Sequence, residues 1–300
     1  MAVIVVNGAD FSANNLGRID IFTEFHPTTL SVFSKFGVTA DDTNELHKAT
    51  DSFVRKLIAA NLWGNGKIDR LALPFLADLS ATKTVSNAVH DCIGDGYVLM
   101  RANTSSTPDG QNLLLSNHGL KPNRNEGICS KFIVPASFTA NSFHLAAYTL
   151  TNETVEEALT KPIFGKFNGQ LASNLSPETN WFLDTTNMVT SPYTELRNVP
   201  KMIIATLDSQ QNDGKGVLYD DGNKMLSPNT NRATTTSESF FRFGAYTANV
   251  YSATASGGYI CPNSSFGILS LGGYLTEEEV GIYELAAKQL VDAIHNYDWE

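Results

Sequence analysis

Short apolar or alternating runs recur from Lys67 to Gly272, and clusters of Gly, Asn, Asp, Ser and Pro separate them. Typical runs are "GYVLMRA", "SKFIVPASF", "FHLAAYTL", "WFLDTT", "KMIIATLD", "SFFRFGAY" and "SFGILSLGG". Each run has the length of a β-strand, and Gly, Asn and Asp tolerate the backbone geometry of tight turns. Many short strands divided by turns are typical of an antiparallel sandwich or barrel. The sequence therefore predicts a mainly β fold.

A helical pattern precedes this β region. Within a helical segment over residues 28–66, we expect one flanking helix near residues 42–62. Asp42, with Glu45 three residues later, is the predicted N-cap pair. The glycines of "NLWGNG" follow the expected end of this helix. The apolar residues at helical spacing are Leu46, Ala49, Phe53 and Leu57.

A second helix is predicted after the last apolar run, where "GGYLTEEEVGIY" occupies residues 272–283. The paired glycines can take backbone angles that strain other residues, so a sharp turn is expected there. Thr276 and Glu279 form a capping box, and three glutamates place negative charge at the positive end of the helix dipole. The predicted helix covers residues 277–296. Its apolar stripe, expected to pack on the sandwich or on the 42–62 helix, is Val280, Tyr283, Ala287, Leu290 and Ile294.

Composition excludes several function classes. The formal net charge of −10 over 300 residues argues against binding to a phosphate backbone, which needs clustered Lys and Arg. No apolar stretch approaches the roughly 20 residues that cross a bilayer, so no membrane insertion is expected. The first residues, "MAVIVVNGADFS", lack the basic flank of an export signal. The three cysteines have no short spacing, so neither a disulfide framework nor a metal knuckle is predicted.

The order of the later motifs resembles a known family. "KMIIATLD", "GVLYDDGNKM", "SFFRFGAY" and "SFGILSLGGYLTEEEVGIYELAAKQLVDAI" resemble the C-terminal half of laminin-G or concanavalin A-like jelly rolls. Leu275, Thr276 and Glu279 occupy the L-T-x-x-E helix start of that family. "DSFVRKLIAANLWGNGKIDRLALPFLADLSATKTVSNA" and "NGADFSANNLG" are similar to segments of structural proteins from tailed bacteriophages. The resemblance covers about residues 1–90 and 200–296, and residues 95–195 fit by texture.

The resemblance implies an organisation and a function. Residues 1–27 would be an N-terminal anchoring arm, residues 28–66 a helical segment, and residues 67–300 a concanavalin A-like (LamG-type) antiparallel jelly roll with its C-terminal helix. The implied protein is a structural virion component of a tailed phage, a head- or tail-fibre or appendage subunit. It would be made in the host cytoplasm, join other virion proteins through its arm, form a symmetric homo-oligomer such as a trimer, and contact host-surface glycans.

An enzyme is the less favoured interpretation. Retaining glycoside hydrolases need two carboxyl groups about 5–5.5 Å apart, and alternate acids on one strand would supply them. No strand here carries such a pair: Asp184 in "WFLDTT" is a lone acid, and Glu277 to Glu279 are explained by helix capping. We therefore expect no catalytic residue and no cofactor. A carbohydrate-binding or glycan-cleaving domain is kept as the alternative.

Two groups of residues could still bind a ligand. The acid-rich turns "DSQQNDG" and "YDDGN" could face one another across neighbouring loops and bind calcium. The spacing does not match a calcium loop, so an ordinary turn is the favoured interpretation. The cation ligands considered are Asp208, Asp213, Asp220 and Asp221. Aromatic residues in or beside loops could contact a glycan, although a core role is favoured for Trp181. These aromatic residues are Trp181, Tyr246, Tyr251 and Tyr259.

Overall fold

The computed structural model describes most of both ends of the chain and part of its middle. The described residues are 24–101, 113–116, 118–122, 130–139, 141–151, 201–220, 222–226 and 264–299, together with the backbones of the strands at 161–166, 172–175, 178–184, 187–192, 241–243, 245–246 and 259–260. Residues 1–23 of the predicted arm (residues 1–27) lie outside the described residues, as do Asp221 and Tyr251, whereas Pro27 already belongs to the first helix.

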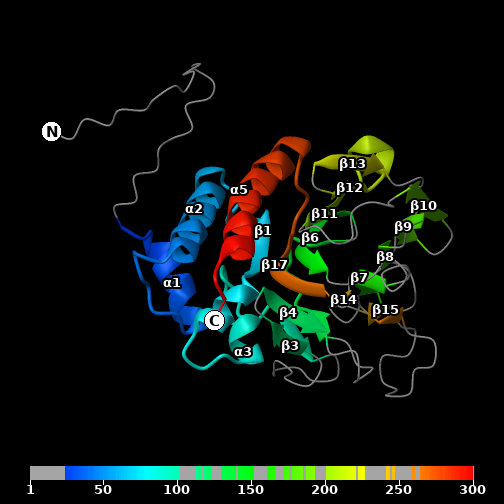
Figure 1. The fold of residues 1–300 in the computed structure, drawn as a ribbon. Coiled ribbons are helices and arrows are strands. Elements are labelled where there is room, and N and C mark those ends of the chain that lie inside the picture. Colours follow the sequence, from blue (N-terminus) through cyan, green and yellow to red (C-terminus); the bar gives the residue numbers. More distant parts are fainter. Residues whose placement is uncertain are drawn as a thin grey trace, which may run out of the picture.

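The described strands confirm a mainly β, antiparallel fold (Figure 1). The first sheet has eight described strands in the order β13-β12-β11-β6-β17-β4-β3, with β1 beside β17. The second has seven described strands in the order β10-β9-β8-β7-β14-β5-β2, and β15 pairs with β16.

The strand bounds follow the predicted runs. The first sheet consists of β1 (Ile68–Ala72), β3 (Leu113–Ser116), β4 (Gly119–Pro122), β6 (Ser142–Thr151), β11 (Lys201–Asp208), β12 (Val217–Asp220), β13 (Asn223–Leu226) and β17 (Ser264–Gly272). The second consists of β2 (Leu99–Arg101), β5 (Ser130–Phe132), β7 (Lys161–Lys166), β8 (Ala172–Leu175), β9 (Glu178–Asp184), β10 (Asn187–Pro192) and β14 (Phe241–Phe243). The short pair is β15 (Ala245–Tyr246) with β16 (Tyr259–Ile260).

Both faces of the first sheet are buried. On β6, Ala146 and Tyr148 join one hydrophobic core with the helices, whereas Leu145 and Ala147 join a second core on the opposite face. That second core includes Leu99 of the second sheet. Successive residues of a strand point to opposite faces, so a sheet covered on both sides needs nearly continuous apolar runs such as "FHLAAYTL". The first sheet is therefore the middle layer between the helices and the second sheet.

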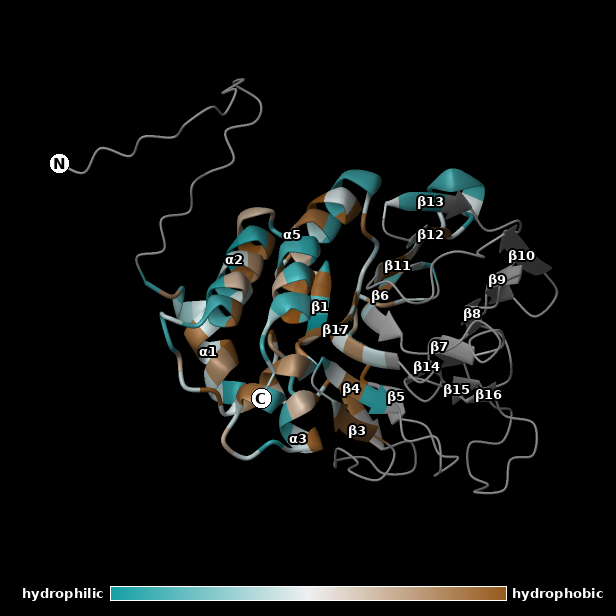
Figure 2. Ribbon diagram, viewed as in Figure 1, coloured by the Kyte–Doolittle hydropathy of each residue, from teal (hydrophilic) through white to brown (hydrophobic). Residues whose placement is uncertain are grey.

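Three helices, α1 (Pro27–Phe36), α2 (Glu45–Ala59) and α5 (Glu277–Asn296), form the layer on the first sheet (Figure 1). Figure 2 shows hydrophobic and hydrophilic residues alternating along each of these helices, and the residues that the helices bury are mostly apolar. The predicted stripe of α5 is fully or almost fully buried and packs against both α2 and the first sheet. The shorter helices are η1 (Pro74–Leu79), α3 (Val85–Ala88) and η2 (Asn212–Gly214). None of the described helices is long and apolar enough to span a membrane.

The first helical region differs from the prediction in its boundaries. It contains two helices, and the N-cap of α2 is Asn44 rather than Asp42. The Asn44 side chain accepts hydrogen bonds from the backbone N–H groups of Leu46, at 2.9 Å, and His47, at 3.2 Å. Asp42 is exposed and lies two residues before this cap, so the predicted Asp42–Glu45 pair is wrong. Asparagine immediately before the first helical residue is an equally good cap.

The paired glycines before α5 serve a different purpose from the one predicted. Gly272 and Gly273 are not among the positive-φ residues; they lie against the backbone of the segment entering β1. A Cβ on Gly272 would lie 1.7 Å from the Lys67 carbonyl oxygen, and one on Gly273 would lie 2.2 Å from the Gly66 carbonyl oxygen. The absence of a side chain therefore permits close backbone packing, and a strained turn angle is not the reason for these glycines.

Candidate functional site

The N-terminal end of the described chain is fastened to α2 by a group of contacts that we call the N-terminal clamp, formed by Glu24, Phe25, His26, Asp51 and Arg55. The backbone N–H of His26 donates to Asp51 Oδ1 at 2.8 Å. Arg55 Nε donates to Asp51 Oδ2 at 2.5 Å, and Arg55 Nη2 donates to the Glu24 carbonyl at 2.6 Å. One carboxylate and one guanidinium thus hold the backbone at Glu24 and at His26.

Burial makes the clamp more than a surface ion pair. The Asp51 side chain is 3% exposed, and both of its oxygens are hydrogen-bonded. A buried carboxylate is tolerated only when it is paired and hydrogen-bonded, so Asp51 depends on these partners. Arg55 is 42% exposed and lies one turn further along the same helix, where an i,i+4 partner is within reach.

Aromatic packing and a helix cap complete the clamp. The Phe25 ring meets the Phe33 ring edge-on at a centroid distance of 5.5 Å. The Nδ1 atom of His26 accepts a hydrogen bond from the Thr28 backbone N–H, so His26 caps α1, and Pro27 occupies the first helical position. Pro suits that position because its missing N–H would have had no helical partner. The chain before Glu24 therefore joins a fixed point in the helical layer.

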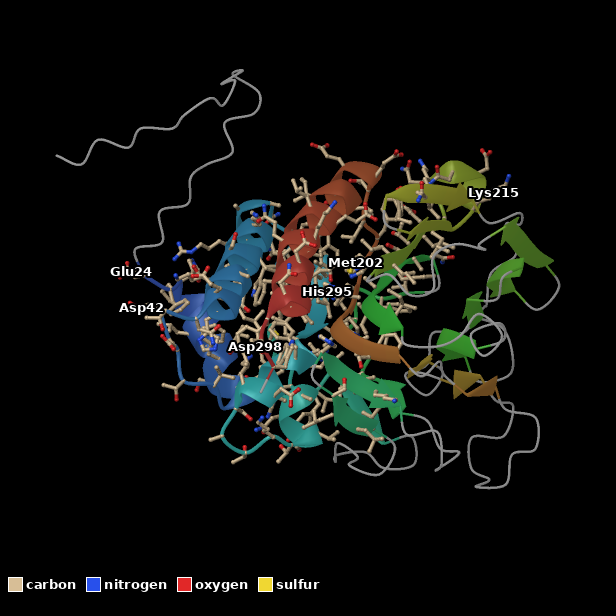
Figure 3. The ribbon with its side chains drawn as sticks, in the orientation of Figure 1. Glu24, Asp42, Met202, Lys215, His295 and Asp298 are labelled. Atoms are coloured by element: carbon tan, nitrogen blue, oxygen red, sulfur yellow. The ribbon has the colours of Figure 1, made fainter. Side chains whose placement is uncertain are left out.

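The clamp and the second sheet lie on opposite sides of the molecule. Figure 3 labels Glu24 at the outer edge of the helical layer, and Figure 1 shows β9 and β10 of the second sheet at the opposite edge. The first sheet separates the helices from the second sheet, because each of its faces belongs to a different core. The clamp therefore lies on the helical side of the first sheet.

A second buried carboxylate, Asp91, fixes the loop that follows α3. Arg70 Nη1 lies 2.6 Å from Asp91 Oδ2, and the backbone N–H groups of Leu71 and Ile93 donate to Oδ1. The carboxylate is fully buried. The ammonium group of Lys35 on α1 donates to the backbone carbonyls of Asp91, Cys92 and Gly94 at 3.1, 3.3 and 2.8 Å. Asp91 and Lys35 are thus saturated by structural contacts.

A buried polar network joins α5 to the first sheet. Tyr283 Oη donates to Ser270 Oγ at 2.8 Å, and Ser270 Oγ lies 3.3 Å from His144 Nε2. His144 Nδ1 lies 2.8 Å from the Gly273 carbonyl oxygen, which fixes Nδ1 as the protonated nitrogen. Burial lowers the pKa of His144 to about 4, so the ring is neutral at pH 7. All three side chains are fully buried, so this Ser–His pair has no access to a dissolved substrate.

The acidic turns predicted as a cation site do not face one another. Asp208 ends β11 and accepts the Gln210 backbone N–H at 2.9 Å, whereas Asp213 is exposed at φ 55°. Asp220 pairs with Asn223 at the other end of β12. The two turns are therefore at opposite ends of that strand, and the arrangement considered for a cation, in which they face one another, does not occur for the described residues. Within the described residues, no group of three His, Cys, Asp or Glu side chains could hold a metal ion.

Two of the predicted aromatic residues come together in register. Tyr246 of β15 and Tyr259 of β16 are direct partners across an antiparallel ladder, although they are far apart in sequence. Trp181 lies in β9, between Ser173 of β8 and Val189 of β10. Asp184, the lone acid considered for hydrolysis, ends the same strand opposite Asn187. Directly opposed positions share one face of a ladder, so β15 and β16 place two tyrosine positions side by side.

No family model and no curated protein sequence matches the chain. Among solved structures, the chain is similar to Trypanosoma rangeli sialidase in complex with sialic acid, with a TM-score of 0.46 and 15% identity over 81% of this chain. It spans 39% of that sialidase. Domain 4 of AbnA, a GH43 extracellular arabinanase from Geobacillus stearothermophilus in complex with arabinotriose, has a TM-score of 0.45 and 12% identity over 73% of this chain and 98% of that domain. The binding domain of botulinum neurotoxin serotype D has a TM-score of 0.42 and 10% identity over 73% of this chain and 51% of that one.

Proposed function

We propose that the chain is a structural virion protein of a tailed phage, a head- or tail-fibre or appendage subunit. Its sandwich is a concanavalin A-like jelly roll, its attachment segment is the sequence before Glu24, and it works as a symmetric homo-oligomer without catalysis. The observation that carries the proposal is the N-terminal clamp. Exposed termini are ordinarily held by few contacts. A segment with no attachment role would therefore not need a buried carboxylate that binds the backbone where the segment joins the fold.

The contacts of the clamp suit a load-bearing attachment. A pull on the segment before Glu24 reaches Arg55 and Asp51 first, and these side chains belong to the middle of α2. From α2 the load passes to α5 and the first sheet, because all three share one hydrophobic core. We assign contact with a surface to the second sheet, on the opposite side of the first sheet.

The experiment is a deletion designed on the clamp. Removal of residues 1–23 keeps Glu24, His26 and Pro27, whereas removal of residues 1–27 would also destroy the cap of α1. The shortened chain is expected to melt within about 2 °C of the full chain, since it keeps every contact among the described residues. It is expected to be absent from particles when produced together with the other virion proteins.

A matched control replaces residues 1–23 by a Gly/Ser segment of equal length. This control is also expected to fold and to stay out of particles, because the sequence rather than the length of the segment binds the neighbours. Incorporation of either variant at the level of the full chain contradicts the proposed attachment. Precipitation or unfolding of both variants contradicts it too, since residues 1–23 would then belong to the core.

A second candidate function is glycan binding, supported by the register of Tyr246 and Tyr259. Two tyrosines on one face of a ladder could offer a sugar ring a flat apolar surface with polar edges. A glycan array probed with the full chain tests this function. Tyr246→Ala and Tyr259→Ala are each expected to weaken binding about tenfold, the loss of roughly 1.4 kcal/mol. Tyr297→Ala, in the helical layer, is the matched control and should bind as the unmodified chain does.

The same array separates binding from cleavage. If the immobilised glycans are shortened, and Asp184→Asn abolishes the shortening, the glycan-cleaving alternative replaces the binding function. If no glycan is retained, the second candidate function is wrong, while the attachment proposal stands on its own deletion experiment.

A further inference from the structure

The outward face of α5 carries apolar side chains that the fold leaves exposed. Leu285 is 64% exposed and Ile282 is 36% exposed, although both belong to a helix whose other face is buried. Gly281 lies one turn before Leu285, and a Cβ added to it would meet nothing within 4 Å. Glycine in the middle of a helix lowers its stability, and its φ is not positive here, so backbone geometry does not require it.

Opposite charges flank this apolar face. Glu278 and Lys288 are both exposed, and neither forms an ion pair within the described part of the chain. The neighbouring glutamates are paired, Glu277 with Lys224 and Glu279 with Lys67. Because residues three and four apart lie on one side of a helix, Glu278, Gly281, Leu285 and Lys288 form a single stripe.

We propose that this stripe binds α5 of a second copy of the chain, antiparallel and about a two-fold axis. In the register that places Glu278 opposite Lys288 of the partner, Gly281 lies opposite the partner's Leu285. The leucine side chain then fills the space that the glycine leaves open, and the backbones approach closely. Two-fold symmetry repeats each contact, so one interface contains two ion pairs and two such insertions.

The charges select this register and this occupant. A shift of one helical turn would place Glu278 opposite Asp292 of the second copy, and like charges repel. The two charges of the stripe, Glu278 and Lys288, complement those of the same stripe on a second copy. Residues 1–23 of the same chain, the other occupant considered, contain Arg18 as their only basic side chain. One helix crossing is smaller than a standard interface, so the association is expected to be reversible and concentration-dependent. The proposed self-association through α5 does not depend on the proposed virion function.

Sedimentation velocity of the full chain at low salt tests the charge pairs. Glu278→Lys and Lys288→Glu are each expected to weaken self-association about tenfold, because each turns two attractions into two repulsions. The double variant with both changes should associate as strongly as the unmodified chain, because the pairs are restored in reverse. Asp42→Lys, an exposed charge change away from α5, is the control. Weakening by the control, or a double variant no better than the single variants, overturns the proposal.

Gly281→Leu separates an interface role from a role in the monomer. The substitution fills the space meant for Leu285 of the partner, so self-association should be lost while the melting temperature rises. Unchanged association overturns the proposed insertion. A photo-reactive benzoylphenylalanine at position 285 then identifies the occupant, and cross-links to residues 278–285 of a second copy are expected. Cross-links to residues 1–23 of the same chain, or to no protein at all, contradict the proposal.

Discussion

The hydroxyl of Tyr283 donates a 2.8 Å hydrogen bond to Ser270 Oγ and so joins α5 to β17 in the interior of the molecule. Both residues are fully buried, and Ser270 also contacts His144. The neighbouring strands β6 and β17 are thereby both connected to the last helix. Three predictions concern this connection and the glycines beside it.

Tyr283→Phe is expected to lower the free energy of unfolding by about 1 kcal/mol, the usual net value of one hydrogen bond. Ser270→Ala should cost more, about 2–3 kcal/mol, because it leaves both the Tyr283 hydroxyl and His144 Nε2 buried without that partner. Urea denaturation of both single variants and the double variant measures the coupling. Strictly additive losses would show that the network is not a unit.

The stability of the protein should depend on pH through His144. Burial lowers its pKa from 6.5 to about 4, so the unfolded chain binds a proton in the range between these values that the folded chain does not. Stability therefore falls as the pH decreases from about 6.5 to 4, by up to about 3 kcal/mol. The same sign applies to His47 and His90, whose pKa values burial also lowers.

The measurement is a series of urea unfolding curves between pH 4 and 7 for the unmodified chain and His144→Gln. The variant is less stable at pH 7, but its stability should change less with pH, because one titrating group is gone. Parallel curves for the two proteins would exclude His144 as a source of the acid sensitivity.

Gly272→Ala and Gly281→Ala should change stability in opposite directions. At Gly272 the new methyl group would collide with the Lys67 carbonyl oxygen, so a loss of about 3 kcal/mol or more is expected. At Gly281 the methyl group enters open space in a helix, so a gain of about 1 kcal/mol is expected. Thermal melting of the pair measures both effects, and a tolerated alanine at 272 would contradict the close packing of β1 on β17.

Arg55→Ala should loosen the N-terminal clamp. The substitution leaves Asp51 Oδ2 without its donor and frees the Glu24 carbonyl, at a cost of about 1–2 kcal/mol because Arg55 is partly exposed. Amide hydrogen exchange at His26 should accelerate more than exchange in α5. Arg55→Lys retains a charge but not the forked geometry, and is expected to recover part of the loss. Equal exchange rates at His26 in all three proteins would contradict the clamp.

Local signals made part of this structure predictable. The Thr276–Glu279 capping box is present, and the helix after it spans the predicted residues, because every signal for it lies within one turn. The glycine of "DDGN" is a local signal of the same kind, since β12 and β13 pair on either side of Gly222, whose φ is 84°. The cap of α2 was placed on the wrong residue because Asp and Asn are both good caps, and two acceptors stood within one turn of each other.

Contacts between distant segments were not predictable. His144 contacts Gly273, which is 129 residues away in the sequence, and Asp91 contacts Arg70, which is 21 residues away. No local sequence pattern indicates either contact. The i,i+4 spacing of Asp51 and Arg55 could have suggested their pairing, but not the burial of Asp51 or its bond to His26. The apolar runs of β6 and β11 indicated strands, and the stripe of α5 indicated packing on the sandwich or on the 42–62 helix. No local pattern indicated that three helices would share one core with this sheet.

The central claim, membership of a virion, is tested most directly by mass spectrometry of purified particles from cells that make both the chain and the phage. The account predicts tryptic peptides of the full chain in the particles at a fixed ratio to the capsid protein, and their disappearance when residues 1–23 are deleted. Particles that lack the full chain while it accumulates free in the same cells would contradict the claim.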